Sequence, residues 1–159
     1  MRKLFLTLCL GLSLLIFPLL PINSMPAMAA VNSETAISEV YLPEAIDNFL
    51  TSLPSDYYTL MNVNALKSIV KRDNALLIDV RQPSEYASGH IPNAINIPLQ
   101  TLTKNLDKIP QDRPVVLYCT TGYRTAMGVM SLQMLGYSNV RAFPPSIQGW
   151  KVAGEPLEK

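Results

Sequence analysis

Two short apolar segments of the chain lack the alternation of apolar and polar residues that a strand exposed on one face would show. They are residues 76–80, Leu-Leu-Ile-Asp-Val, and residues 115–118, Val-Val-Leu-Tyr. Because neighbouring side chains of a strand point to opposite faces, a continuous apolar run predicts a strand that is covered on both faces. Such strands are typical of parallel sheets in α/β domains.

Helical patterns separate these segments from further short apolar runs. The repeated order of strand and helix predicts a mostly parallel sheet with right-handed crossovers and helices on both faces. We therefore expect an α/β domain with a five-stranded sheet. Its strands are expected at residues 57–60, 76–80, 94–97, 115–118 and 139–142, and its helices at 63–71, 83–88, 99–109 and 124–135.

The first 29 residues have the layout of a secretory signal peptide. Arg2 and Lys3 precede an apolar run at 4–17, and the small residues Ala27-Met28-Ala29 follow at the distance of a cleavage site. We predict cleavage after Ala29 and export of the protein, with the periplasm as the first choice.

The alternative is that this segment is retained as a membrane anchor. Residues 4–20 are seventeen in number, at the lower limit for a helix that crosses a bilayer. A membrane-anchored form therefore stays open at this stage, as does an organelle lumen reached by a similar signal. A membrane is expected as a partner only if the segment is uncleaved.

The rest of the chain is predicted to form an extension and one domain. In the extension, residues 30–56, a helix is expected at 43–53, because Pro43 suits a first helical position and Pro54 ends the pattern. Residues 57–159 are expected to form a single compact domain.

The balance of charge argues against a protein that binds nucleic acid. The chain has 13 Lys and Arg against 12 Asp and Glu. Removal of residues 1–29 would leave 11 against 12, a formal net charge of −1. A basic surface of the kind that binds nucleic acid is therefore not expected.

Cys119 would be the single cysteine of the mature protein, because Cys9 lies in the targeting segment. No internal disulfide can form, which leaves a reactive thiol, a thiol that pairs with another molecule, or a buried inert thiol as alternatives. The backbone amides of the short loop after Cys119 can point at the sulfur, and Gly122 permits the turn. A fall of the thiol pKa from about 8.5 to about 6.5 would need about 2.7 kcal/mol, which one or two hydrogen bonds can supply.

A histidine base, a metal site and a cofactor are not expected. His90 is the only histidine of the chain, and its place in a turn before a strand indicates a structural hydrogen-bonding residue. One cysteine and one histidine also fall short of the ligand number of a zinc site.

Two long motifs and a shorter ending follow the expected strands. Residues 77–98 read Leu-Ile-Asp-Val-Arg-Gln-Pro-Ser-Glu-Tyr-Ala-Ser-Gly-His-Ile-Pro-Asn-Ala-Ile-Asn-Ile-Pro, and residues 115–126 read Val-Val-Leu-Tyr-Cys-Thr-Thr-Gly-Tyr-Arg-Thr-Ala. With the ending at 149–157, they resemble the signatures of the rhodanese-like domain family. The resemblance covers about residues 57–157 and implies the three-layer rhodanese-like fold.

The resemblance also implies a single-domain sulfurtransferase. Cys119 would take the outer sulfur of a small donor such as thiosulfate, hold it as a persulfide, and pass it to a thiol or a cyanide-like acceptor. Arg124 would bring a permanent cation for an anionic donor. The loop that would bind the transferred sulfur consists of Thr120, Thr121, Gly122, Tyr123 and Arg124.

Two other functions are weighed against this one. The loop from Cys119 to Arg124 counts six residues, as in the sulfurtransferases that it resembles, whereas related phosphatases and arsenate reductases have seven. A non-enzymatic binding or redox-sensing module on the same fold is disfavoured because the cysteine and the complete loop are both present.

Three further features are noted beside the loop. Asp79 and Arg81 are expected to form a mutually paired scaffold near the site. Glu85 stands where two-domain thiosulfate sulfurtransferases tend to carry a basic residue, which weakens the case for thiosulfate as the natural donor. Pro144 and Pro145 depart from the Gly-Gly pair that the family usually shows, and are expected to stiffen or reshape the rim of the site.

Overall fold

The computed structural model of the chain describes residues 33–159. The predicted signal peptide at 1–29, with its cleavage site and Cys9, lies outside the described residues. No helix within 33–159 combines the length and the apolar composition that a membrane crossing requires.

A parallel sheet forms the centre of the domain. Its order is β2-β1-β3-β4, and each neighbouring pair is parallel. The central pairing of β1 with β3 joins Leu76 to Val115 and continues to Asp79 and Tyr118. The prediction of an α/β fold with a parallel sheet is confirmed. The strands are β1 (Leu76–Asp79), β2 (Ile95–Asn96), β3 (Val115–Tyr118) and β4 (Val140–Ala142).

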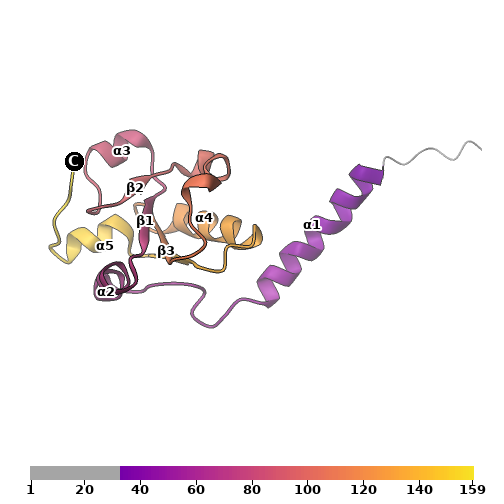
Figure 1. The fold of residues 1–159 in the computed structure, drawn as a ribbon, viewed down its shortest axis with the longest axis horizontal. Coiled ribbons are helices and arrows are strands. Elements are labelled where there is room, and N and C mark those ends of the chain that lie inside the picture. The colour runs from indigo at the N-terminus through magenta and orange to yellow at the C-terminus, as the bar shows by residue number, and fades with distance from the viewer. Residues whose placement is uncertain (1–32) are drawn as a thin grey trace, which may run out of the picture.

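Helices cover both faces of the sheet and make two separate hydrophobic cores (Figure 1). On one face, Leu102 and Leu132 pack against alternate residues of β1 and β3. On the other face, Leu66 and Trp150 pack against the remaining ones. The helices are α2 (Val63–Asp73), α3 (Pro83–Ala87), η1 (Leu99–Lys104), η2 (Leu106–Lys108), α4 (Tyr123–Met134) and α5 (Ser146–Val152), where η marks a 3₁₀ helix.

The expected strand at 57–60 is reduced to a single bridge, so the sheet has four strands rather than five. Thr59 bridges to Ala142 in the parallel direction. The preceding residues Tyr57 and Tyr58 have φ of 46° and 55°, in the left-handed region that a strand cannot use. The chain therefore turns where the strand was expected to begin.

The expected helix at 99–109 is two short 3₁₀ helices, η1 and η2. They break at Asn105, whose φ of −128° lies outside the helical region. The amide of its side chain donates to the carbonyl oxygen of Thr101 at 2.8 Å, a local bond that competes with the helical pattern. The α5 helix was not predicted, because its seven residues follow directly on two prolines.

The first helix is longer than expected. α1 spans Ser33–Thr51, so Pro43 lies inside it rather than in its first turn. Proline removes one helical hydrogen bond, which the helix tolerates here. In Figure 1, α1 projects from the domain, and its C-terminal end lies nearest the body.

Candidate active site

Cys119 follows the last residue of β3 at the carboxyl edge of the sheet. Because side chains alternate along β3, Tyr118 packs in the core of α2 and α5, whereas Cys119 packs in the core of α4. The residue is only 1% exposed. Loops at this edge of a parallel sheet commonly form binding sites.

The loop after Cys119 turns its backbone toward the sulfur. The amide of Gly122 donates to Sγ of Cys119 at 3.1 Å. Gly122 has φ of +100°, and a Cβ atom there would lie 3.0 Å from the carbonyl oxygen of Pro144. The turn therefore requires glycine, and Pro144 closes against it from the next loop.

Hydrogen bonds lower the pKa of Cys119 to about 7. Burial alone would raise this pKa, because it disfavours the thiolate. The hydroxyl of Thr125 and the backbone amides of Thr125, Gly122 and Thr121 outweigh burial by stabilising the anion. The direction agrees with the expectation from the sequence that the loop amides favour a thiolate.

Thr125 is a site residue that the sequence analysis missed. Its side chain is fully buried, and its hydroxyl has no hydrogen-bond partner of ordinary geometry within residues 33–159. Burying an unpaired hydroxyl costs about 1–3 kcal/mol. This hydroxyl lowers the pKa of the nearby Cys119 thiol, so it can donate to the thiolate form. The motif at 115–126 includes Thr125. However, the order of its residues does not indicate that the Thr125 hydroxyl lies beside Cys119.

Ser146 is a second missed residue. Its hydroxyl accepts a hydrogen bond from the Cys119 amide at 3.2 Å and lies 3.8 Å from Sγ. The backbone of Ser146 has φ of 51°, a left-handed conformation that glycine usually takes. Although the chain lacks the Gly-Gly pair of the family, the backbone at Ser146 still adopts a glycine-like turn. Its side chain adds a hydroxyl beside the sulfur.

Arg124, the cationic residue of the cysteine loop, forms an ion pair with Glu85. Both carboxylate oxygens of Glu85 accept from Arg124, at 2.6 and 2.9 Å, and Arg124 also donates to the hydroxyl of Thr120 at 2.8 Å. The hydrogen bond from Arg124 is the main reason that the pKa of Glu85 falls to about 2. Arg124 and Glu85 therefore form a charge-compensated pair at neutral pH. Of the predicted loop, Thr121 and Tyr123 point their side chains to solvent.

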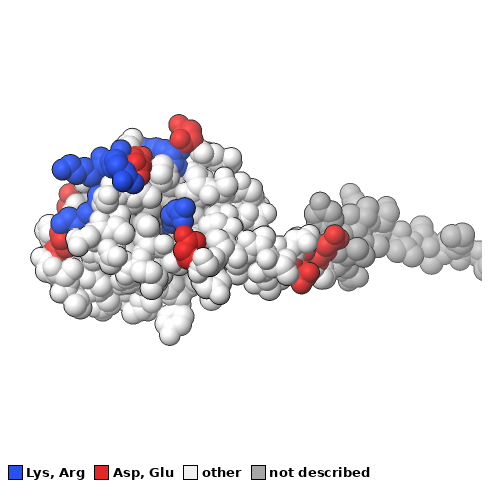
Figure 2. Space-filling view, turned by 90° about the horizontal axis from the view of Figure 1, so that it is seen from below, with Lys and Arg blue, Asp and Glu red and all other residues white. Residues whose placement is uncertain are grey.

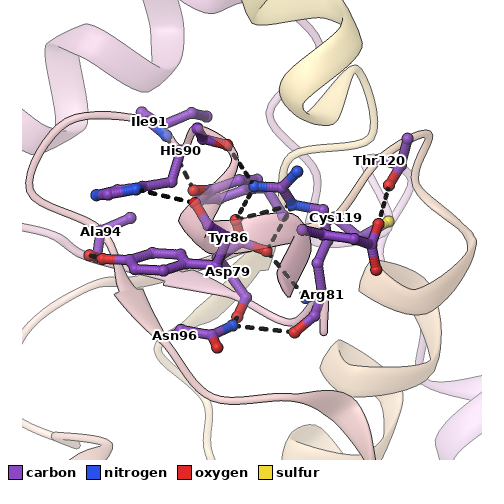
Figure 3. Close-up of polar contacts among 12 residues, drawn as sticks. Asp79, Arg81, Tyr86, His90, Ile91, Ala94, Asn96, Cys119 and Thr120 are labelled. Carbon is purple, nitrogen blue, oxygen red and sulfur yellow. Dashed lines mark hydrogen bonds and ion pairs between the residues drawn. The ribbon is translucent and has the colours of Figure 1, made fainter. Parts of the chain in front are cut away.

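Asp79 and Arg81 form a buried ion pair beside the root of the loop (Figure 3). Arg81 Nη2 lies 2.6 Å from Asp79, and the Arg81 side chain also donates to the carbonyl oxygen of Gly89. Asp79 pairs in the sheet with Tyr118, the residue before Cys119. The pair thus connects the motif at 77–98 with the motif at 115–126. Among the described residues, none of the hydrogen bonds of the pair goes to the Cys119 sulfur.

His90 lies away from the sulfur in this arrangement. Its ring stacks on Tyr86, with centroids 3.8 Å apart, and its backbone pairs with Glu158 near the C-terminus. Within residues 33–159, no three His, Cys, Asp or Glu side chains come together in a way that could hold a metal ion. The polar groups beside Cys119 are the hydrogen-bond donors described above, which can hold a sulfur anion.

Alkylation of Cys119 should report the strength of these donors. Because only the thiolate reacts, the rate with iodoacetamide is expected to rise with pH and reach half its plateau near pH 7. A Thr125→Val variant should raise this midpoint by about one pH unit or more, since a hydrogen bond to a charged group contributes about 1.5–3 kcal/mol. Thr121→Val is the matched control, because Thr121 is exposed and acts on Cys119 through its backbone amide rather than its side chain. Equal midpoints in the two variants would contradict the role of Thr125.

Comparisons with known proteins agree with the geometry. The model of the Rhodanese-like domain family matches residues 62–153. A sulfurtransferase of Allochromatium vinosum is 35% identical over 85 residues, which are 54% of this chain and 79% of that protein.

Two solved structures resemble the described fold. A rhodanese-related protein from Thermoplasma volcanium gives a TM-score of 0.58 at 32% identity, over 64% of this chain and 98% of that one. The human single-domain sulfurtransferase TSTD1 gives 0.56 at 27% identity, over 60% of this chain and 96% of that one.

Proposed function

The chain belongs to the rhodanese-like domain family, and from this premise we propose that it transfers sulfane sulfur through a persulfide on Cys119. In the first step, the Cys119 thiolate attacks the outer sulfur of a donor. A new S–S bond forms, the donor's own S–S bond breaks, and the leaving group departs with that electron pair. In the second step, a thiolate or cyanide acceptor attacks the outer sulfur and releases the Cys119 thiolate.

The convergence of donors on one sulfur carries this proposal. The amides of Thr121, Gly122 and Thr125, with the Thr125 hydroxyl, favour the anionic form of Cys119. A thiolate is the nucleophile in the first step and the leaving group in the second, so the same donors assist both. A persulfide would also place the reactive sulfur one atom further from the buried Sγ.

The remaining residues of the predicted site act on the loop. Arg124 and Thr120 are held by Glu85, which fixes the outer part of the loop. Asp79 and Arg81 support the start of the loop, where it follows β3. We therefore assign Cys119 the catalytic role and these residues a positioning role.

Mass spectrometry of the intact protein tests the proposal. After incubation with a panel of sulfane donors, including thiosulfate and an organic persulfide, the mass should increase by one sulfur atom. Cyanide should remove that atom and yield an equal amount of thiocyanate. A protein that gains no sulfur from any donor, while its Cys119 stays reduced and reactive to iodoacetamide, would overturn the proposal in favour of a binding module.

We also propose that the mature protein acts after export, as the sequence of residues 1–29 predicts. Edman sequencing of the protein isolated from expressing cells should find a new N-terminus after Ala29. An intact N-terminus in the membrane fraction would favour the anchored form instead.

A further inference from the structure

An apolar pocket lies between the end of α1 and α4. Its volume is about 560 Å³. The apolar walls come mainly from the last turn of α1, the segment that follows it, and the exposed side of α4, and residues of the cysteine loop and the end of β4 complete the lining. The apolar walls include Phe49, Leu50, Leu53, Ala126, Val129 and Met130. We call this cavity the α1–α4 pocket.

One end of the α1–α4 pocket is the cysteine loop itself. Thr121, Gly122 and Tyr123 line the pocket, and the amides of the first two point at Cys119. Pro144, which packs against Gly122, lines it as well. A molecule in the pocket therefore lies directly against the rim of the sulfur site.

The surroundings of this rim carry no free cation within the described residues. None of the residues that line the α1–α4 pocket is charged. Arg124 is compensated by Glu85, and Arg81 is buried and paired with Asp79. In the view of Figure 2, most of the Lys and Arg side chains gather at the end of the domain away from α1. Binding of a dianion such as thiosulfate would therefore gain little from charge attraction in this pocket. Binding of an uncharged, apolar molecule does not depend on such attraction.

We propose that the α1–α4 pocket binds the acceptor, and that this acceptor is a thiol with an uncharged, apolar body. This inference rests on the proposed sulfur transfer and names the substrate class of that same site. The pocket volume lies within the range of about 300–1,000 Å³ that is usual for small-molecule sites. The thiol end would reach over Gly122 to the outer sulfur, while the body lies between Leu50 and Tyr123.

The extension that precedes the domain takes part in this site. Phe49, Leu50 and Leu53 belong to α1 or follow it directly, and all three lie before the region that the family model matches. One apolar wall of the pocket is therefore supplied by a part of the chain outside the shared domain, and the other is supplied by α4. The cysteine loop provides the chemistry, and the extension contributes to the selectivity.

Single-turnover kinetics with two thiols tests the inference. The protein is first charged with sulfur, and loss of the persulfide is then followed with phenylmethanethiol, which has an aromatic body, and with 2-mercaptoethanol, which is small and polar. The ratio of the two second-order rate constants is expected to favour phenylmethanethiol by about tenfold or more, because burial of the ring from water adds to binding.

Two variants of α1 form a matched pair for this ratio. Leu50 and Leu42 are 53% and 57% exposed, and only Leu50 lines the pocket. Leu50→Asp should lower the ratio about tenfold, because it places a charge beside the bound ring. Leu42→Asp should leave the ratio as in the unmodified protein.

The possible results separate the two proposals. If no persulfide forms in the unmodified protein, the proposed function fails. If a persulfide forms and cyanide removes it, but the ratio is near one or changes equally in both variants, only the acceptor inference is overturned. A pocket that serves instead as a docking groove for another protein would give this second result.

Discussion

A Cys119→Ser variant is expected to form no persulfide and to lose at least about 1,000-fold of the sulfur-transfer rate. Serine has nearly the shape of cysteine, so the amides of Thr121 and Gly122 can stay in place. Its hydroxyl stays protonated at neutral pH, however, and oxygen cannot carry the sulfane sulfur through the cycle. Intact mass after exposure to a donor and the release of thiocyanate to cyanide measure the two losses.

The chain offers one internal control for this experiment. Cys9 is the only other cysteine, and a Cys9→Ser variant of the full chain should keep the persulfide and the rate. Thermal unfolding of Cys119→Ser should resemble that of the parent protein, since the hydroxyl fits the same space. If the Cys119→Ser variant still accepts one sulfur atom at its remaining cysteine, the transfer does not pass through Cys119.

The sheet could be predicted from the sequence because its signal is local. The apolar runs at 76–80 and 115–118 require cover on both faces, and only a parallel arrangement with helices on each side provides it. The run at 57–60 gave a similar signal but forms one bridge. Its outcome depends on left-handed conformations at Tyr57 and Tyr58, which no local pattern of apolar residues reveals.

The cysteine loop could be predicted for the same reason, since Cys119 and its loop are contiguous in the chain. The groups that complete the site are not contiguous. Ser146 lies 27 residues from Cys119, and Glu85 lies 39 residues from Arg124. The first is brought in by the turn into α5 and the second by the capped start of α3, where Glu85 also accepts from the Gln82 amide.

Arg124 is paired with Glu85 and is not a free cation at the site. From the sequence, this residue was expected to attract an anionic donor. Its guanidinium is instead held by Glu85 and Thr120, in bonds of 2.6 to 2.9 Å. The cysteine sulfur is an anion that the site favours, through backbone amides and the Thr125 hydroxyl, and Arg124 adds to this through its charge. The paired guanidinium also fixes the position of Thr120 in the loop.

The buried pair of Asp79 and Arg81 serves the strand that carries the loop, and its loss should have the largest effect on stability. An Asp79→Asn variant is expected to lower the free energy of unfolding by about 3–5 kcal/mol, because it leaves the Arg81 cation buried without a counter-ion. The side chains are 0% and 5% exposed, so water cannot replace the carboxylate. Urea denaturation at neutral pH measures the change.

Two controls separate charge from shape in this experiment. Asp73→Asn breaks an ion pair with Arg72 on the surface of α2, and it should leave the urea midpoint nearly unchanged because water screens that pair. A double variant, Asp79→Leu with Arg81→Met, should recover most of the stability, since it removes both buried charges together. If Asp79→Asn costs no more than Asp73→Asn, the buried pair does not support β1 and β3. The root of the loop must then be held by the apolar packing of the two strands alone.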